Sequence, residues 1–459
     1  MEQNERLATE SVPRLLLRLS LPAVTAQVIN ALYNIVDRMY IGRIAEIGTN
    51  ALTGVGITFP VIMIISAFAS LIGMGGAPFT SIKMGQRDNE GAERILGNCT
   101  MMLVTISVIL TAVLFFVKQP VLYLFGASDV TFPYANDYLS IYLVGTLAVQ
   151  ISLGLNSFIT AQGYASTAMA TVLIGAVCNI VLDPIFIFLL GMGVKGAALA
   201  TIISQTVSAV WVICFLTGKK AVLKIRRKFL SFVCNDTGRV LALGLSPFIM
   251  QSTESLIQIC FNVTLKQFGT DLDIGAMVIL TSVMQMVLMP LSGVTQGAQP
   301  IIGYNYGAKN YARVKSTIKY MVGICCAYAV VIWTLCIFFP RIPCSIFSGD
   351  EHLVPLAAGY MKTFCFGILL FGLQIAFQNS FVALGNAKYS IFLALLRKIV
   401  LLIPLTLILP RIGLGVYGVF LSEPIADICA ALTTTTIFLL SAKKFLNPSN
   451  NSDSSTANK

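Results

Sequence analysis

The chain has 459 residues, of which 56% are hydrophobic and only 11% are charged. A water-soluble protein of this length could not bury so much apolar surface, so the composition excludes a soluble globular fold. The net charge of +11 comes from basic loops and does not require nucleic acid as a partner. Residues 1–13 are polar, and the apolar run after them has no small-residue cleavage site, so we expect no signal peptide.

Hydropathy over helix-length windows predicts twelve membrane-spanning helices, each long enough to cross a hydrocarbon layer of roughly 30 Å. Their expected limits are 14–41, 50–82, 95–117, 133–160, 166–190, 196–217, 240–267, 275–305, 315–339, 355–383, 388–409 and 415–441. The predicted fold class is therefore an all-α polytopic membrane protein.

Basic residues gather on alternate loops. With the N-terminus placed in the cytoplasm, the cytoplasmic side receives most of them, namely Lys83, Arg87, Arg94, the run from Lys219 to Arg239, Lys309, Arg313, Lys315, Lys319, Lys388, Arg397, Lys398, Lys443 and Lys444. The outer side keeps only scattered charges. By the positive-inside rule, both termini are predicted to be cytoplasmic and the protein to lie in the cytoplasmic membrane. The basic run 219–228 could bind acidic lipids, but a role in setting topology is favoured.

Glycines, prolines and small residues recur at a constant offset. Nine pairs lie 222 residues apart: Gly75/Gly297, Pro78/Pro300, Gly85/Gly307, Gly163/Gly385, Ala165/Ala387, Gly191/Gly413, Gly193/Gly415, Val194/Val416 and Gly196/Gly418. An even number of helices in each repeat makes the halves parallel, related by an axis along the membrane normal, with a substrate path between them. We expect an N-lobe at 1–218, a basic linker at 219–239, a C-lobe at 240–446 and a disordered tail at 447–459.

Four oxygen-bearing side chains of the first half are expected in the outer half of the membrane at similar depth: Asp37, Asn179, Asp183 and Thr201. Ionisable groups inside a bilayer are costly and usually functional. Oxygen ligands suit a hard cation such as Na⁺, and two acids can share a proton. The structural alternative is an ion pair of Asp37 with Arg38 or Arg43. Pro184 follows Asp183 and is expected to kink its helix.

Matching polar faces in the two halves predict one central cavity. On the first helix, Gln27, Asn30 and Asn34 follow helical spacing, and at an offset of 224 they map onto Gln251, Glu254 and Gln258. The acids break the symmetry, because Thr201 maps onto Glu423 at the offset of 222. Methionines adapt to varied ligands. The predicted substrate cavity comprises Gln27, Asn30, Asn34, Asn156, Gln251, Glu254, Gln258, Met286, Gln378 and Glu423.

The eleven cysteines do not indicate a metal or disulfide framework. Most lie inside apolar segments, where cysteine behaves as a small hydrophobic residue, and Cys325 and Cys326 are adjacent rather than spaced as metal ligands. The only histidine is His352, so no histidine-based metal site is expected. We expect no cofactor.

The segments LSLPAVTAQVINALYNIVDRMYIGR (19–43), NSFITAQG (156–163), NIVLDPIF (179–186) and GVKGAALAT (193–201) resemble the multidrug and toxic compound extrusion (MATE) family. The resemblance is greatest to its DinF-related bacterial branch, which includes MepA-type exporters, and it covers about residues 10–445. It implies a V-shaped fold and export of amphipathic, often cationic drugs in exchange for H⁺ or Na⁺, with no enzymatic activity. We expect a monomer.

In this family an N-lobe cation site uses an aspartate on helix 1, an asparagine and an aspartate on helix 5 and a threonine on helix 6. By this resemblance Asp37, Asn179, Asp183 and Thr201 form the coupling site, with Na⁺ as a possible ligand of the first three. Glu254 resembles the acid on helix 7 of another branch, but its partner acid on helix 10 is absent, since that helix carries Gln374 and Gln378.

Two alternatives remain open at this stage. A lipid-linked oligosaccharide flippase would be expected to carry cationic groups in its cavity, and the spans show few basic residues apart from Arg38 and Lys362. An intramembrane aspartyl enzyme using Asp37 and Asp183 is disfavoured, because neither lies in a G-x-G-D segment. Sequence does not distinguish H⁺ from Na⁺ as the coupling ion.

Overall fold

The computed structural model describes residues 2–44 and 47–446, and throughout these ranges its regular elements are helices. The predicted tail at 447–459 lies outside the described residues. The longer helices are α2 (Val12–Gly42), α3 (Gly48–Gly85), α4 (Asn89–Leu124), α5 (Phe132–Val144), α6 (Thr146–Ala161), α7 (Ala165–Pro184), α8 (Gly193–Thr217), α9 (Cys234–Phe268), α10 (Asp271–Gly307), α11 (Tyr311–Phe338), α13 (Leu353–Phe364), α14 (Ile368–Ala383), α15 (Ala387–Leu395), α16 (Ile403–Ile408) and α17 (Gly415–Phe445).

Shorter elements connect or extend these helices: α1 (Glu2–Thr9), η1 (Ile185–Leu189), η2 (Arg227–Phe229), α12 (Arg341–Ser345), η3 (Cys365–Gly367), η4 (Leu396–Leu402) and η5 (Leu409–Ile412). Eleven helical segments of the described chain are long and apolar enough to cross a membrane. A twelfth span forms if α5 and α6, which bend by 60° at Gly145, are taken together. The all-α polytopic fold class is confirmed.

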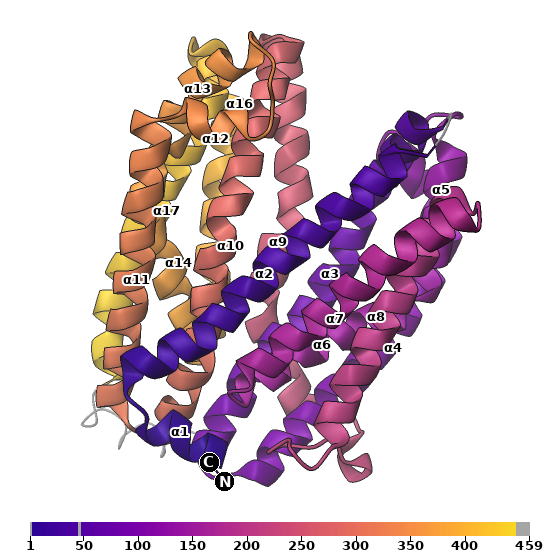
Figure 1. Ribbon diagram of the computed structural model, residues 1–459. Helices are drawn as coiled ribbons and strands as arrows, with labels where there is room; N and C mark the ends of the chain where they lie inside the picture. The colour runs from indigo at the N-terminus through magenta and orange to yellow at the C-terminus, as the bar shows by residue number, and fades with distance from the viewer. Residues whose placement is uncertain (1, 45–46, 447–459) are drawn as a thin grey trace.

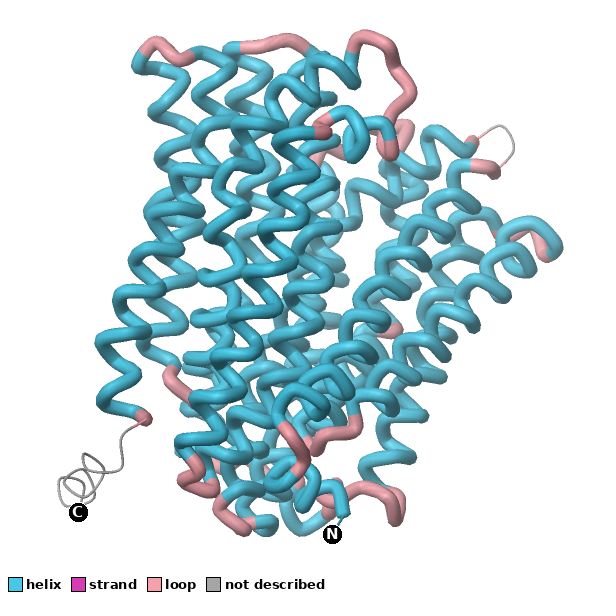
Figure 2. The backbone as a smooth tube through the Cα atoms, turned by 60° about the vertical axis from the view of Figure 1, so that its left-hand side comes forward, coloured by secondary structure: helices cyan, strands magenta, loops and turns pink. Residues whose placement is uncertain are grey.

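Two bundles of helices form a V (Figure 1). They meet at the end that carries both ends of the described chain and diverge toward the other end (Figures 1 and 2). One bundle contains α3 to α8 and has two apolar cores, one near the open end of the V and one near the closed end. The other contains α10 to α17 and has a single large core. We call these bundles the N-lobe and the C-lobe.

The first long helix of each lobe crosses between the bundles. Leu15 and Leu16 of α2 join the core of the C-lobe, whereas Ile41 near the end of the same helix joins the core of the N-lobe. Helix α9 does the reverse, because Val240 packs in the N-lobe core and Phe261 in the C-lobe core. This exchange ties the two lobes together and places the polar faces of α2 and α9 toward the space between them.

Glycines that recur along the sequence allow the lobes to approach closely at the closed end. Gly75 and Gly244 face each other where α3 crosses α9, and Gly297 faces Ser20 where α10 crosses α2. A Cβ atom at Gly297 would lie 2.6 Å from the Cα of Ser20, which is far below an ordinary contact. The repeated glycines therefore belong to one interface that is built twice by pseudo-symmetry.

The segment between the lobes is pinned to the start of α4. Helix α9 begins at Cys234, so it takes up the last part of the linker predicted at 219–239. Arg226 pairs with Glu93 at 2.6 Å, and Lys228 pairs with Glu90 at 2.7 Å. Two basic residues of the linker are thus paired with acids of the N-lobe.

Candidate functional site

A cavity of about 830 Å³ lies between the lobes. Polar side chains of α2 line its N-lobe side, and glutamines of α9 and α10 line its C-lobe side. It brings together many of the predicted site residues, namely Gln27, Asn30, Asn34, Asp37, Asn156, Thr201, Gln251 and Gln258. The polar face of α2 and, from the matching face of α9, Gln251 and Gln258 line one common cavity.

Hydrogen bonds between the lobes lie along this cavity. Ser70 on α3 donates to Oε1 of Gln251 on α9 at 2.9 Å. Gln27 on α2 donates to Oε1 of Gln296 on α10 at 3.5 Å. These contacts join polar side chains that a substrate or a change of lobe angle could separate.

A cluster of buried oxygens lies in the N-lobe beside the cavity. Asn179 donates through Nδ2 to Oδ1 of Asp183 at 3.2 Å and to Oγ1 of Thr201 at 3.4 Å. The carboxyl groups of Asp37 and Asp183 contact each other. Both acids are buried, Asp183 completely. The structure thus brings together the four residues predicted as a coupling site.

Three oxygens in this cluster have no hydrogen-bond partner among the described residues: Oδ1 of Asp37, Oδ1 of Asn179 and Oδ2 of Asp183. Neither aspartate forms an ion pair within the described residues. The guanidinium of Arg38, the base next to Asp37 in sequence, lies over the ring of Phe59 at 5.0 Å instead. Two contacting carboxylates repel each other unless a proton or a cation lies between them. Oxygen ligands of this kind suit a hard cation as well as a proton.

The helix that carries Asp183 is irregular beyond it. Helix α7 ends at Pro184, and a π-helical turn, η1, follows directly. Proline cannot donate a backbone hydrogen bond, and a widened turn absorbs the missing bond. The expected break at Pro184 is therefore a π-helical turn next to the carboxylate, a distortion often found at functional positions.

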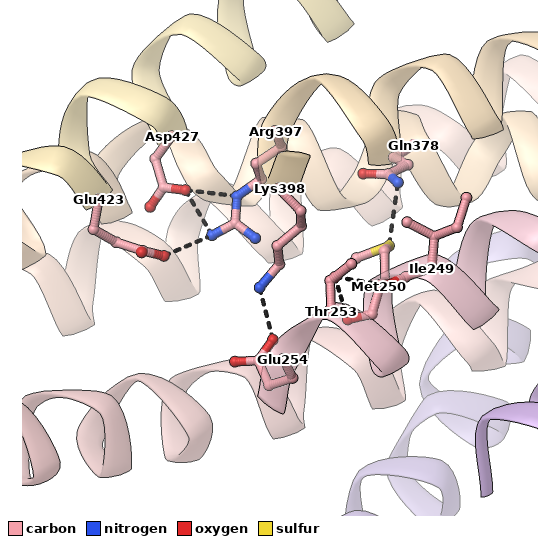
Figure 3. A network of polar contacts seen from close by, with 9 residues as sticks. All are labelled: Ile249, Met250, Thr253, Glu254, Gln378, Arg397, Lys398, Glu423 and Asp427. Carbon is pink, nitrogen blue, oxygen red and sulfur yellow. Dashed lines mark hydrogen bonds and ion pairs between the residues drawn. The ribbon is translucent and has the colours of Figure 1, made fainter. Parts of the chain in front are cut away.

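The C-lobe holds a separate cluster of charged side chains at its centre (Figure 3). Arg397 contacts Asp427 at 2.7 Å and Glu423 at 3.0 Å. Lys398 reaches Glu254 on α9 at 2.7 Å. Glu254 and Glu423 line a small pocket of about 20 Å³ beside the main cavity rather than the cavity itself.

The assignment of Arg397 and Lys398 to the cytoplasmic side is wrong, and so is the expectation that the spans hold few basic residues. Both side chains are buried within the apolar segment Ala387–Ile412. The physical reason is that three acids on α9 and α17 neutralise them, so they need not reach the membrane surface.

Two further predicted cavity residues lie elsewhere in this conformation. Gln378 is buried in the C-lobe, where it accepts a hydrogen bond from Gln374 at 3.0 Å and contacts the sulfur of Met250 at 3.2 Å. Met286 on α10 is about half exposed and is not among the residues that line the three pockets.

Comparison with known proteins decides the family. The family model described as MatE matches residues 22–185 and 247–408, once in each lobe. The chain belongs to the MatE family. Among its relatives, the multidrug export protein MepA of Staphylococcus haemolyticus (strain JCSC1435) is 25% identical over 431 residues, 94% of each chain. The MepA of Staphylococcus aureus (strain MRSA252) is also 25% identical over 431 residues, 93% of each chain.

Solved MATE structures share this fold. A crystal structure of MATE in the bent conformation has a TM-score of 0.90 at 22% identity and covers 97% of this chain and 98% of its own. An outward-facing conformation of a multidrug resistance MATE family transporter of the MOP superfamily has a TM-score of 0.89 at 22% identity, covering 96% and 98%. The predicted resemblance to the MATE family is confirmed.

Sequence reasoning missed several cavity residues of this MatE-family chain. Gln285, Gln296 and Gln299 on α10 line the cavity. Their separations of 11 and 3 residues place them on one helical face, which is the signal that could have identified them. Of the methionines on the same helix, Met277 and Met284 are buried in the C-lobe core.

Proposed function

We propose that this MatE-family chain is a secondary transporter that exports amphipathic, often cationic compounds across the cytoplasmic membrane in exchange for H⁺ or Na⁺. It would act as a monomer with both termini in the cytoplasm. The N-lobe (1–218) would carry the coupling site, and the C-lobe (240–446) would complete the substrate cavity. No cofactor is needed, because the ion gradient supplies the driving force.

Relatives and cavity together support the export of such compounds. Curated relatives covering more than nine-tenths of the chain are named multidrug export proteins. The cavity combines amide side chains with apolar and aromatic ones such as Phe59, Met63 and Met169. A wide, mixed surface of this kind accepts varied amphipathic molecules without a fixed shape.

One observation carries the coupling proposal: Asp37 and Asp183 contact each other and are buried, and no base among the described residues forms an ion pair with either. Oxygens of both acids, and of Asn179 beside them, are left unpaired. Asp37 and Thr201 also line the substrate cavity. Negative charge at this place would attract either a cationic substrate or a coupling ion, so the two would compete for it.

Such competition gives export by alternating access. In the described conformation the lobes are joined at the end with both termini (Figure 1), so cytoplasmic termini would make this state open to the outside. A proton or Na⁺ from outside would neutralise the acid pair and favour release of a cationic substrate. Reversal of the V would then expose the site to the cytoplasm for the next exchange.

The flippase alternative gains two intramembrane bases, Arg397 and Lys398, but little support from them. Three acids pair with these two bases, so the cluster as a whole is not cationic. Arg38 does line the cavity. A single arginine beside Asp37 and Asp183 makes a poor site for a lipid diphosphate, which carries several negative charges.

The test uses purified protein in proteoliposomes loaded with a fluorescent organic cation, with an imposed pH gradient in one series and an imposed sodium gradient in the other. Export driven by one gradient identifies the coupling ion. Asp183→Asn is expected to abolish gradient-driven export, and Asp37→Asn to reduce it strongly. Asp129→Asn removes an exposed acid of the same lobe and serves as the control, with full activity expected.

Full gradient-driven export by Asp183→Asn would contradict the coupling assignment while leaving export intact. The absence of export by the unaltered protein under both gradients would contradict the function itself. Binding of a lipid diphosphate but of no organic cation would favour the flippase. The side on which the C-terminus lies is measured separately, by the activity of a reporter enzyme fused to Lys459.

A further inference from the structure

The charged cluster of the C-lobe is not used by the coupling mechanism above. It joins η4, α9 and α17 (Figure 3). The guanidinium of Arg397 contacts Asp427 and Glu423, and it lies over the ring of Phe371 at 4.7 Å. Lys398, the next residue, extends beside Arg397 and reaches Glu254. A π-helical turn at Leu396–Leu402 presents these two consecutive bases inside the lobe.

The cluster holds one acid more than bases. Arg397 and Lys398 balance two of the three carboxylates, which leaves one negative charge unmatched. One acceptor, Oδ2 of Asp427, is buried and has no hydrogen-bond partner in the part of the chain that the structure describes. A buried charge of this kind is costly unless a proton or another cation joins the cluster. By formal charge, the cluster can therefore take up one additional positive charge.

Only one of the five side chains can be reached from outside the cluster. The side chains of Arg397, Lys398, Glu423 and Asp427 are each at most 8% exposed, whereas that of Glu254 is 39% exposed. Glu254 opens into the small pocket of about 20 Å³. Aromatic and aliphatic residues complete that pocket, namely Ile257, Phe261, Met284, Leu288 and Phe364.

The small pocket adjoins the central cavity. Gln258, Thr281 and Gln285 line both. A carboxylate beside aromatic rings is a favourable surface for an organic cation, which gains from charge attraction and from contact with the ring faces. The pocket is nevertheless too small for more than a water-sized group, because the ammonium of Lys398 already contacts Glu254.

The corresponding positions in the N-lobe show that the side chain of Lys398 fills space that is open there. At the offset of 222, Arg397 and Lys398 correspond to Gly175 and Ala176. These two small residues line a larger N-lobe pocket of about 80 Å³ together with Asn30, the counterpart of Glu254. In the C-lobe, long basic side chains stand at the positions of these small residues, and a carboxylate stands at the position of the amide.

We propose that Glu254 is a second substrate subsite, which takes the single positive charge of a monovalent organic cation, and that Lys398 is a built-in competing cation which the substrate displaces. This inference rests on the proposed function. Lys398 lies within Coulombic range of Glu423 and Asp427, so the displaced ammonium turns toward the unpartnered oxygen of Asp427. Two bases and two acids then balance, and Glu254 pairs with the substrate.

The test measures binding, independently of transport, on the full chain in lipid nanodiscs. The probes are benzyltrimethylammonium and its neutral carbon isostere, neopentylbenzene, which share shape but differ in charge. Lys398→Met removes the competitor, and we expect it to tighten cation binding by about tenfold, equivalent to about 1.4 kcal/mol. Lys398→Arg pairs with Glu254 by two hydrogen bonds and should weaken cation binding. Glu254→Gln should reduce the preference for the cation over the isostere to the part that Asp37 and Asp183 supply, and Lys398→Met should no longer tighten cation binding in the Glu254→Gln background.

Lys362→Met is the matched control, because Lys362 is an exposed lysine of the same lobe. The Lys362→Met variant should bind the cation as tightly as the unaltered protein does. Unchanged or weaker cation binding by Lys398→Met overturns the proposal, as does cation binding by Lys398→Arg at least as tight as that of the unaltered protein. If either contradicting result is found while the unaltered protein still exports an organic cation, the subsite is refuted and the export function stands. If the unaltered protein exports no organic cation, the proposed function is refuted.

Discussion

Close backbone contact between the lobes makes one glycine a sensitive test of the structure. Gly297 lies where α10 crosses α2 at the closed end of the V. A Cβ added there would lie 2.6 Å from both the backbone N and the Cα of Ser20, whereas ordinary contact begins at 3.4 Å. Backbone atoms cannot rotate away as a side chain does, so α2 would have to retreat by most of an ångström.

Gly297→Ala is therefore expected to destabilise the protein by about 1–3 kcal/mol, the usual cost of overpacking. Helix propensity acts in the opposite direction, because alanine favours a helix by about 1 kcal/mol over glycine. The retreat would also lengthen the hydrogen bond from Ser20 Oγ to the carbonyl of Val294, now 3.2 Å. Gly323→Ala in α11 is the control, since a Cβ there meets open space, and it should be neutral or stabilising.

The assay is thermal unfolding of the purified variants in detergent, with hydrogen exchange to locate the change. Backbone amides of residues 15–21 and 290–300 should exchange faster in Gly297→Ala and not in Gly323→Ala. Equal stability of the two variants would refute the inferred packing of α2 against α10. Faster exchange elsewhere, with these two segments unchanged, would place the strain outside the lobe interface.

Two further predictions concern charged groups. Arg397→Met leaves Glu423 and Asp427 buried without a base and should destabilise the protein by about 3–5 kcal/mol, while the triple variant Arg397→Met, Glu423→Gln, Asp427→Asn should recover most of this loss in thermal unfolding. Between α3 and α4, the Lys83 ammonium and the Gly91 backbone N–H donate to Asp88 and hold its pKa below the ordinary 3.8. This stabilisation is present above pH 3.8 and is lost as the pH falls through the lowered pKa, so the unaltered protein should lose more stability there than Asp88→Asn does.

Features that depend on local pattern were predictable from the sequence. Twelve apolar windows, including the bent span at 133–160, follow from composition alone, and the repeated Gly75 and Gly297 mark the crossing points of the lobes. The grouping of Asp37 with Asp183 followed from depth in the membrane and from family resemblance. The first two signals lie within one helix or are repeated in the other half, whereas Asp37 and Asp183 lie on different helices and were grouped with the help of the family resemblance.

Features that depend on contacts between distant helices were not predictable. The positive-inside rule places a base by its position in sequence, and it placed Arg397 and Lys398 at the membrane surface. Their actual partners lie up to 144 residues away, as in the bond between Lys398 and Glu254. A base inside a lobe is stable only because those acids are present, and no sequence window contains both.

The two lobes thus carry residues of opposite character at one pair of corresponding helical positions. The N-lobe leaves Gly175 and Ala176 small and keeps its acids, Asp37 and Asp183, unpaired. The C-lobe replaces the small residues with Arg397 and Lys398, and its acids are largely neutralised from within. In the proposed mechanism, an ion that crosses the membrane balances the charge of the N-lobe, whereas the bases of the C-lobe balance most of the charge there. On this argument, ion coupling and substrate charge selection are divided between the lobes.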